Sequence, residues 1–262
     1  MIERKKGGLR GLFRKDTGLD MERWLEAPDE LANNPPDGLF VKSCERRGFK
    51  WLFDFLTRRM SRARLAWWIS VRLERKGVPA VRVLAAIERR SSRSNWTVME
   101  RLQGNDLRQF LLLHPANEEF PWKRELIRAL AEVIALLHAR GALHQPDLKA
   151  QNIWMEPVNE SEGAWRARLI DLEGMVRRRG YKPYLRARDL ARLCTSFRSE
   201  AFRERGFTRD DWRSLLLEYR ALFETFADRP VPDKEIDWWM ELTESWAERK
   251  ERKNAAEGRA TY

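Results

Sequence analysis

Residues 143–153 constrain the fold more than any other part of this sequence. They read Leu-His-Gln-Pro-Asp-Leu-Lys-Ala-Gln-Asn-Ile, so that Asp147, Lys149 and Asn152 share one short polar segment. A carboxylate, an ammonium and an amide at these spacings would all project from the same loop. Such a loop needs rigid elements on both sides to hold its side chains in place.

The flanking sequence supplies those elements. Residues 122–138 repeat apolar side chains with helical spacing and predict an amphipathic helix that ends at Gly141. Residues 152–155 and 166–170 have the composition of two short strands. Asp171 directly follows the second strand, which places another acidic side chain near the loop.

This set of residues matches the needs of phosphoryl transfer, which depends on positioning and on neutralising phosphate charge. Asp147 is expected to accept or orient the proton of the acceptor hydroxyl, and Lys149 to stabilise the transferred group. Asn152 and Asp171 are expected to hold Mg²⁺, a cation that prefers oxygen ligands. The alternative is a loop whose Asp and Asn side chains merely cap turns.

The first hundred residues predict a small mixed lobe. Residues 39–42 form a short apolar strand that ends in Lys42, after the turn-rich segment 33–38. A helix is expected over residues 60–76, and two strands over 80–87 and 96–100. We expect Lys42 to pair with the α- and β-phosphates of a nucleotide. Residues 1–23 are interpreted either as a flexible basic arm or as a first hairpin.

Two further sites are expected on less specific signals. Glu100 and Leu102 lie where the small lobe ends, and their backbone is expected to meet an adenine ring; a salt bridge at a hinge is the alternative for Glu100. The triplet Arg177, Arg178 and Arg179 follows the second acidic segment and is expected to bind anionic groups on the substrate. A solvated charge run explains the triplet equally well.

Composition narrows the setting. The chain has 262 residues with 51 Lys and Arg against 40 Asp and Glu, a net charge of +11 that favours anionic partners or reflects a solvated basic surface. Cys44 and Cys194 have no metal-like or disulfide-rich spacing, which favours a reducing compartment. Neither a secretory signal nor a membrane-spanning run is apparent. A cytoplasmic location is expected, with peripheral contact to the inner membrane as an added option.

With these residues in place, the chain resembles the lipopolysaccharide core kinases, the bacterial Kdo/heptose kinases of protein-kinase-like fold. The resemblance covers about residues 38–200. It rests on Phe-Val-Lys at 40–42, Ser-Arg-Ala-Arg-Leu-Ala-Trp at 61–67, Lys-Gly-Val-Pro at 76–79, Met-Glu-Arg-Leu at 99–102, Asp-Leu-Lys-Ala-Gln-Asn-Ile at 147–153, Ile-Asp-Leu-Glu at 170–173 and Arg-Asp-Leu-Ala-Arg-Leu at 188–193.

The resemblance implies a bilobal α+β fold, with a small N-lobe of antiparallel sheet and one helix (residues 1–102) and a mainly helical C-lobe (residues 103–262). It further implies ATP with Mg²⁺ as donor, and a sugar hydroxyl of the lipopolysaccharide core glycolipid as acceptor. The sequence departs from kinases in three ways. No glycine-rich loop precedes Lys42, Glu74 is the single carboxylate of the helix over 60–76, and two residues rather than one separate His144 from Asp147. We expect His144 to be a packed side chain bonded to backbone.

These departures keep two other functions open. One is a non-catalytic, pseudokinase-like protein that binds partners or membrane, and the other is a kinase for a soluble small-molecule alcohol. A nucleic-acid binder is not expected, because no motif combines aromatic and basic residues for that purpose.

Overall fold

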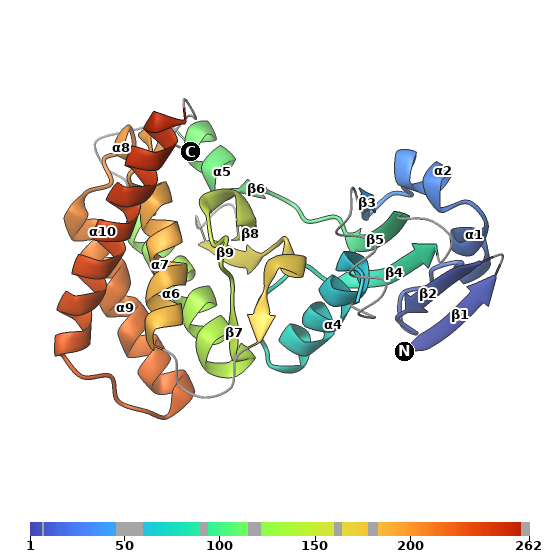
Figure 1. The fold of residues 1–262 in the computed structure, drawn as a ribbon, viewed down its shortest axis with the longest axis horizontal. Helices are drawn as coiled ribbons and strands as arrows, with labels where there is room; N and C mark the ends of the chain where they lie inside the picture. Colours follow the sequence, from blue (N-terminus) through green and yellow to red (C-terminus); the bar gives the residue numbers. More distant parts are fainter. Residues whose placement is uncertain are drawn as a thin grey trace. The chain divides into compact units, whose positions relative to one another are not determined.

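The computed structural model describes most of the chain, namely residues 1–6, 8–45, 60–89, 94–114, 122–159, 164–177 and 183–257. It divides into two compact units (Figure 1). The first comprises Met1–Arg75, Ala80–Leu102 and Asp171–Glu173, and the second comprises Lys76–Pro79, Gln103–Ile170 and Gly174–Tyr262.

The first unit is built on a five-stranded antiparallel sheet with the order β1-β2-β4-β5-β3. Its strands are β1 (Ile2–Lys6), β2 (Leu9–Phe13), β3 (Leu39–Glu45), β4 (Val83–Arg89) and β5 (Ser94–Glu100). Of the two interpretations of the N-terminus, the hairpin is the one observed, because β1 and β2 pair from Ile2 opposite Phe13 to Lys6 opposite Leu9.

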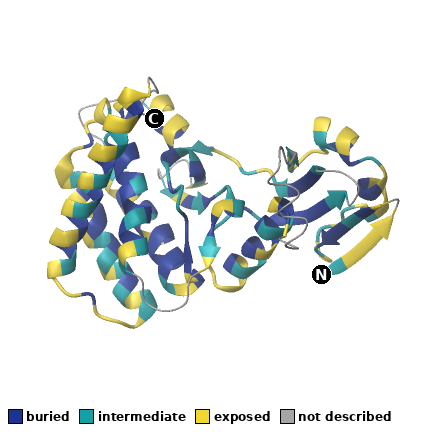
Figure 2. Cartoon of the chain, in the orientation of Figure 1, coloured by how far each residue is buried: buried dark blue, intermediate teal, exposed yellow. Residues whose placement is uncertain are grey.

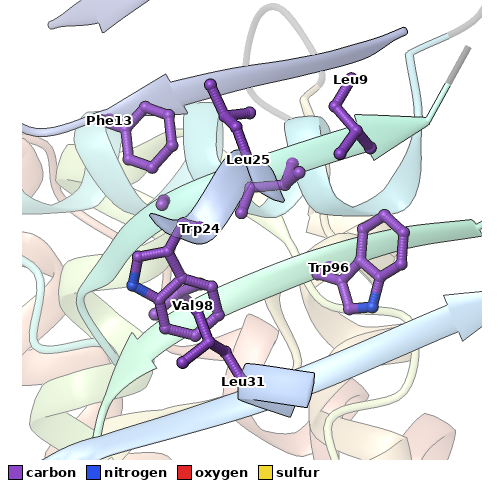
Figure 3. Packing of buried hydrophobic residues seen from close by; sticks show 9 residues of the cluster. Leu9, Phe13, Trp24, Leu25, Leu31, Trp96 and Val98 are labelled. Carbon is purple, nitrogen blue, oxygen red and sulfur yellow. The ribbon is translucent and has the colours of Figure 1, made fainter. Parts of the chain in front are cut away.

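Helices cover both faces of this sheet. On one face lie α1 (Met21–Glu26) and α2 (Pro28–Asn33), whose Trp24, Leu25 and Leu31 pack in a cluster with sheet residues (Figure 3). The sheet contributes Leu9, Phe13, Ala85, Ile87, Trp96 and Val98 to this cluster. The sequence interpretation missed both short helices, although Asp20 caps α1 by accepting hydrogen bonds from two backbone N–H groups.

The other face carries α4 (Arg62–Arg75), close to the expected helix over 60–76. Ser61 accepts the Arg64 N–H at the start of this helix, and Gly77 follows its end with a φ of +66°. The buried Asn95 of β5 accepts the Ala63 N–H, which attaches the start of α4 to the sheet. Side chains alternate between the two faces along a strand, so Thr97, two residues after Asn95, also lies on the α4 face. Lys42 of β3 is opposite Thr97 and shares this face.

The second unit is mainly helical. Its helices are α5 (Leu107–Leu113), α6 (Lys123–Leu136), α7 (Pro183–Phe197), α8 (Glu200–Arg203), α9 (Arg209–Ala227) and α10 (Lys234–Ala256). Its short strands are β6 (Asn105–Asp106), β7 (Leu143–His144), β8 (Ile153–Asn159), β9 (Ala164–Leu169) and β10 (Val176–Arg177). Helix α6 is buried along most of its length and packs against α9, while α7 packs against α10 (Figure 2).

The sequence predicts that Asp106 caps a short helix and that Thr208 and Asp211 form a capping box, and both caps are observed. Asp106 caps α5, and Thr208 with Asp211 forms a complete capping box at the start of α9. The sequence predicts a helix over residues 189–199, but α7 begins six residues earlier, at Pro183. A proline at the first position of a helix loses no helical hydrogen bond. Among the described helices, none is both long and apolar enough to cross a lipid bilayer.

Candidate active site

The loop that carries Asp147, Lys149 and Asn152 lies between β7 and β8 in the second unit. Helix α6 leads toward it through a π-helical turn, Leu137–Gly141, and Ala142 then adopts a left-handed conformation with a φ of +50°. The loop closes on itself, since Leu148 donates its N–H to Gln145 and Asn152 donates its N–H to Lys149. These bonds fix the backbone that bears the functional side chains.

The Asp147 carboxylate is held by cations on both of its oxygens. Arg192 Nε of α7 donates to Oδ1 at 2.9 Å, and Lys149 Nζ lies 3.2 Å from Oδ2. Asn152 Nδ2 donates to the backbone carbonyl of Asp147 at 2.8 Å. Partial burial raises the pKa of Asp147, but the hydrogen bond and charge of Arg192 and the charge of Lys149 outweigh it and leave the pKa below its ordinary value. The carboxylate is therefore ionised at neutral pH.

A buried polar cluster forms hydrogen bonds with the start of this loop. Asp189 of α7 is fully buried, and its Oδ2 accepts from Gln145 N at 2.9 Å, from His144 Nδ1 at 3.1 Å and from His138 Nε2 at 3.3 Å. The hydroxyl of Tyr219 meets His138 Nδ1 at 2.9 Å. His144 is thus packed as expected, and its Nδ1 bonds to the Asp189 carboxylate, a partner that the sequence did not predict. Asp189 lies 45 residues from His144, too far for local sequence to reveal the pair.

Lys42 and Asp171 meet in the first unit. Lys42 Nζ lies 2.5 Å from Asp171 Oδ1 and forms a second ion pair with Glu173. Burial lowers the pKa of Lys42, but the two carboxylates more than offset this and raise it, so the ammonium is retained. Asp171 has a φ of +58°, a left-handed conformation that Asp tolerates better than most residues and that is enriched at functional sites.

Glu173 was missed by sequence reasoning. Glu74, the single carboxylate of the helix expected over 60–76, binds Arg14 and Arg82. The carboxylate that reaches Lys42 comes from the segment of Asp171, two residues further on. The Asp-x-Glu spacing was the available signal, although only the folding of the chain brings Glu173 to the strand lysine, 131 residues away in the sequence.

The remaining predicted residues have distinct surroundings. Glu100 Oε1 accepts the Arg82 N–H at 2.8 Å, a bond between two residues of the first unit. Leu102 ends the first unit after β5. Arg177 is exposed on β10, which pairs with β7 so that Arg177 lies opposite Leu143 at the entry to the loop. Arg178 and Arg179 lie outside the described residues.

A small antiparallel sheet unit, a helical unit and an Asp-x-Lys-x-x-Asn loop braced by a helix define a protein-kinase-like phosphotransferase. The sequence matches the model of the lipopolysaccharide kinase (Kdo/WaaP) family over residues 50–219, and the chain belongs to this family. No curated protein sequence matches the chain.

Two solved structures resemble this chain to different degrees. One described as WaaP in complex with acyl carrier protein is 24% identical, with a TM-score of 0.58 over 95% of this chain and 86% of that one. The kinase domain of PknI from Mycobacterium tuberculosis is 18% identical, with a TM-score of 0.43 over 80% of this chain and 85% of that one. The first of these likenesses confirms the predicted protein-kinase-like fold.

Proposed function

We propose that this protein transfers the γ-phosphate of ATP, with Mg²⁺, to a sugar hydroxyl of the lipopolysaccharide core. Family membership supports a lipopolysaccharide kinase. The proposal adds ATP as the phosphate donor, Mg²⁺ as the metal ion and a sugar hydroxyl as the acceptor. The single observation that carries the proposal is the Asp147 carboxylate, ionised and held at both oxygens at the tip of a rigid loop.

Asp147 orients the acceptor hydroxyl and receives its proton as the new oxygen–phosphorus bond forms, while the bond from the γ-phosphorus to the bridging oxygen breaks and ADP leaves. A carboxylate with a lowered pKa is a weak base, so orientation is its larger contribution. Lys149 is two residues away on the same loop, and its ammonium stabilises negative charge on the transferred phosphoryl group. Both roles require that the loop keep its shape, which the Asp189 cluster ensures.

Lys42 binds the α- and β-phosphates of ATP, and the backbone at Glu100 and Leu102 meets the adenine ring. Asn152 and Asp171 would hold Mg²⁺, which would neutralise phosphate charge when bound. The donor set fits that ion: Asp171 offers carboxylate oxygens, and Asn152 uses its Nδ2 to hold the Asp147 carbonyl, so the oxygen end of the amide is the end suited to a cation.

The acceptor is proposed to be an anionic glycolipid. Arg177 is exposed beside the strand that enters the catalytic loop, where its guanidinium would bind phosphate or carboxylate groups of the core sugars. We include Arg178 and Arg179 in this proposal on sequence grounds alone. The net charge of +11 supports peripheral binding of the protein to the cytoplasmic face of the inner membrane, where anionic lipids are present.

The test is transfer of labelled phosphate from ATP to detergent-solubilised core glycolipid, with a soluble aminoglycoside as the competing acceptor. We expect transfer to the glycolipid only, and its loss in Asp147→Asn, which preserves the shape of the side chain but not its charge. Nucleotide binding without transfer to either acceptor would favour the pseudokinase, and transfer to the aminoglycoside alone would favour a kinase for soluble alcohols.

The metal assignment has its own readout. ATP should raise the melting temperature of the wild-type protein more in the presence of Mg²⁺ than in its absence. Asn152→Ala and Asp171→Ala should each abolish that difference. Equal melting shifts with and without Mg²⁺ in the wild-type protein would contradict the assignment.

A further inference from the structure

Side chains on one face of helix α7 form hydrogen bonds with three residues of the catalytic loop. Asp189, Arg192 and Ser196 are spaced by three and four residues, which places them on the same side of the helix. Asp189 accepts from Gln145 N at 2.9 Å, Arg192 donates to Asp147 Oδ1 at 2.9 Å, and Ser196 Oγ accepts from Ala150 N at 3.1 Å. The helix therefore acts as a template against which the loop is laid.

The three anchors differ in what they hold. Asp189 and Ser196 bind backbone N–H groups of the loop, and both are buried. Arg192 binds the side chain of Asp147, and the two side chains are 24% and 48% exposed. Arg192 is thus the anchor that can set the direction of the functional carboxylate itself.

We propose that Arg192 is a positioning residue of the phosphoryl transfer, which fixes the Asp147 carboxylate and leaves Lys149 available to the phosphoryl group. The inference rests on the proposed function. It assigns a role to a residue outside the Asp-x-Lys-x-x-Asn loop.

The arrangement of cations around Asp147 gives the reason. Arg192 occupies Oδ1, whereas Lys149 approaches Oδ2, to which Asn152 Nδ2 is also directed at 3.4 Å. When Arg192 is removed, Lys149 is the member of this cation pair that stays beside Asp147. Its ammonium is then drawn closer to the Asp147 carboxylate. The carboxylate also gains freedom to rotate, because a single flexible ammonium restrains it less than the planar guanidinium.

Energetics separate this role from a structural one. An ion pair between partly exposed side chains contributes little to folding, because water and salt screen it. A misplacement of a reacting group by about 1 Å costs roughly 100-fold in rate. Loss of Arg192 should therefore affect turnover far more than stability.

The experiment compares Arg192→Ala, Arg192→Lys and wild-type protein in the glycolipid phosphorylation assay. We expect Arg192→Ala to lower kcat about 100-fold with KM for the acceptor changed less than threefold, and Arg192→Lys to fall between the two. Added guanidinium ion should restore part of the kcat of Arg192→Ala, because it can occupy the vacated place beside Oδ1. The matched control is Arg198→Ala, one residue past α7, whose guanidinium binds Glu251 of α10; its kcat should stay within twofold.

The outcomes distinguish this inference from the proposed function. If Asp147→Asn keeps wild-type turnover, the catalytic assignment fails and the Arg192 role fails with it. If Asp147→Asn is inactive while Arg192→Ala turns over normally, or raises the acceptor KM with kcat unchanged, the positioning role alone is overturned. Should Arg192→Ala fold poorly by melting temperature, Arg192→Lys decides: a wild-type kcat in that variant overturns the proposal.

Discussion

At the scale of single residues, the partner of Lys42 is the main departure from the kinase pattern. In kinases, the carboxylate that pairs with this strand lysine comes from a helix of the small lobe, for which α4 is the counterpart here. In this chain, Glu173 from the segment after β9 pairs with Lys42. Lysine and both carboxylates thus form one group, so the strand lysine and the proposed metal ligand Asp171 are held together. A change at Glu173 should disturb both.

The first prediction concerns this group. Glu173→Gln removes one of the two charges that hold Lys42, and we expect kcat/KM for ATP to fall about 10- to 100-fold, as for loss of a charge-assisted contact at a phosphate site. Glu74→Gln is the control, since Glu74 binds Arg14 and Arg82 and should leave kcat/KM within threefold. The reverse ranking of the two variants in steady-state kinetics would contradict the assignment.

The second prediction concerns the pH dependence of stability at the buried cluster. Burial lowers the pKa of His138 to about 4, against an ordinary value near 6.5. Burial raises the pKa of Asp189, but its bonds to His138 and His144 lower it to about 2. Between pH 6.5 and 4 the unfolded chain binds a proton at His138 that the folded chain does not, so stability falls as the pH falls.

Thermal unfolding at pH 7 and pH 5 measures this effect. We expect His138 to contribute a loss of roughly 2 kcal/mol between pH 6.5 and 5. His138→Gln removes the titrating group, so its melting temperature should drop less across this range than that of the wild-type protein. Parallel pH profiles of the two proteins would show that His138 is not the group responsible.

At the scale of elements, the pairing of β6 with β8 depends on a glycine. Gly104 has a φ of +94°, and a Cβ at this position would lie 2.1 Å from the carbonyl oxygen of Met155. The strain is therefore both conformational and steric. Because the backbone at Gly104 passes so close to the backbone of Met155, position 104 has no room for a side chain.

The third prediction follows from this close approach. Gly104→Ala should destabilise the protein by about 3 kcal/mol or more, since a left-handed residue and an overpacked contact each cost about 1–3 kcal/mol. Gly206→Ala is the matched control, with a φ of +67° but no neighbouring atom within 4 Å, and should lose only about 1 kcal/mol. Equal melting temperatures for the two variants would contradict the steric argument.

At the scale of the whole molecule, charge is the dominant property. The excess of 11 positive charges is larger than solubility requires and supports the proposed approach to an anionic membrane surface. Long-range attraction of this kind is screened by salt, because the Debye length falls from about 10 Å at 0.1 M to about 3 Å at 1 M.

The fourth prediction uses that dependence. The protein should co-float with vesicles that contain phosphatidylglycerol but not with vesicles of phosphatidylcholine alone, and about 1 M NaCl should release it. The glycolipid is left out of the vesicles so that acceptor recognition plays no part. Binding that is equal for both vesicle types, or that persists in high salt, would rule out the electrostatic contact.

The sequence determined what depends on local pattern. Apolar periodicity gave the main helices, Asp106 and Thr208 marked their starts, and the spacing of Asp147, Lys149 and Asn152 indicated the loop. Capping and periodicity are set by neighbours a few residues apart, so they are legible in the chain itself.

Only the tertiary structure decided which distant side chains meet. It brought Glu173 to Lys42, Asp189 to both His138 and His144, and Arg192 to Asp147, across separations of 45 to 131 residues. Ion pairs and buried hydrogen bonds form wherever packing brings complementary groups together, and packing is a property of the whole fold. No local pattern in the sequence specifies those partners.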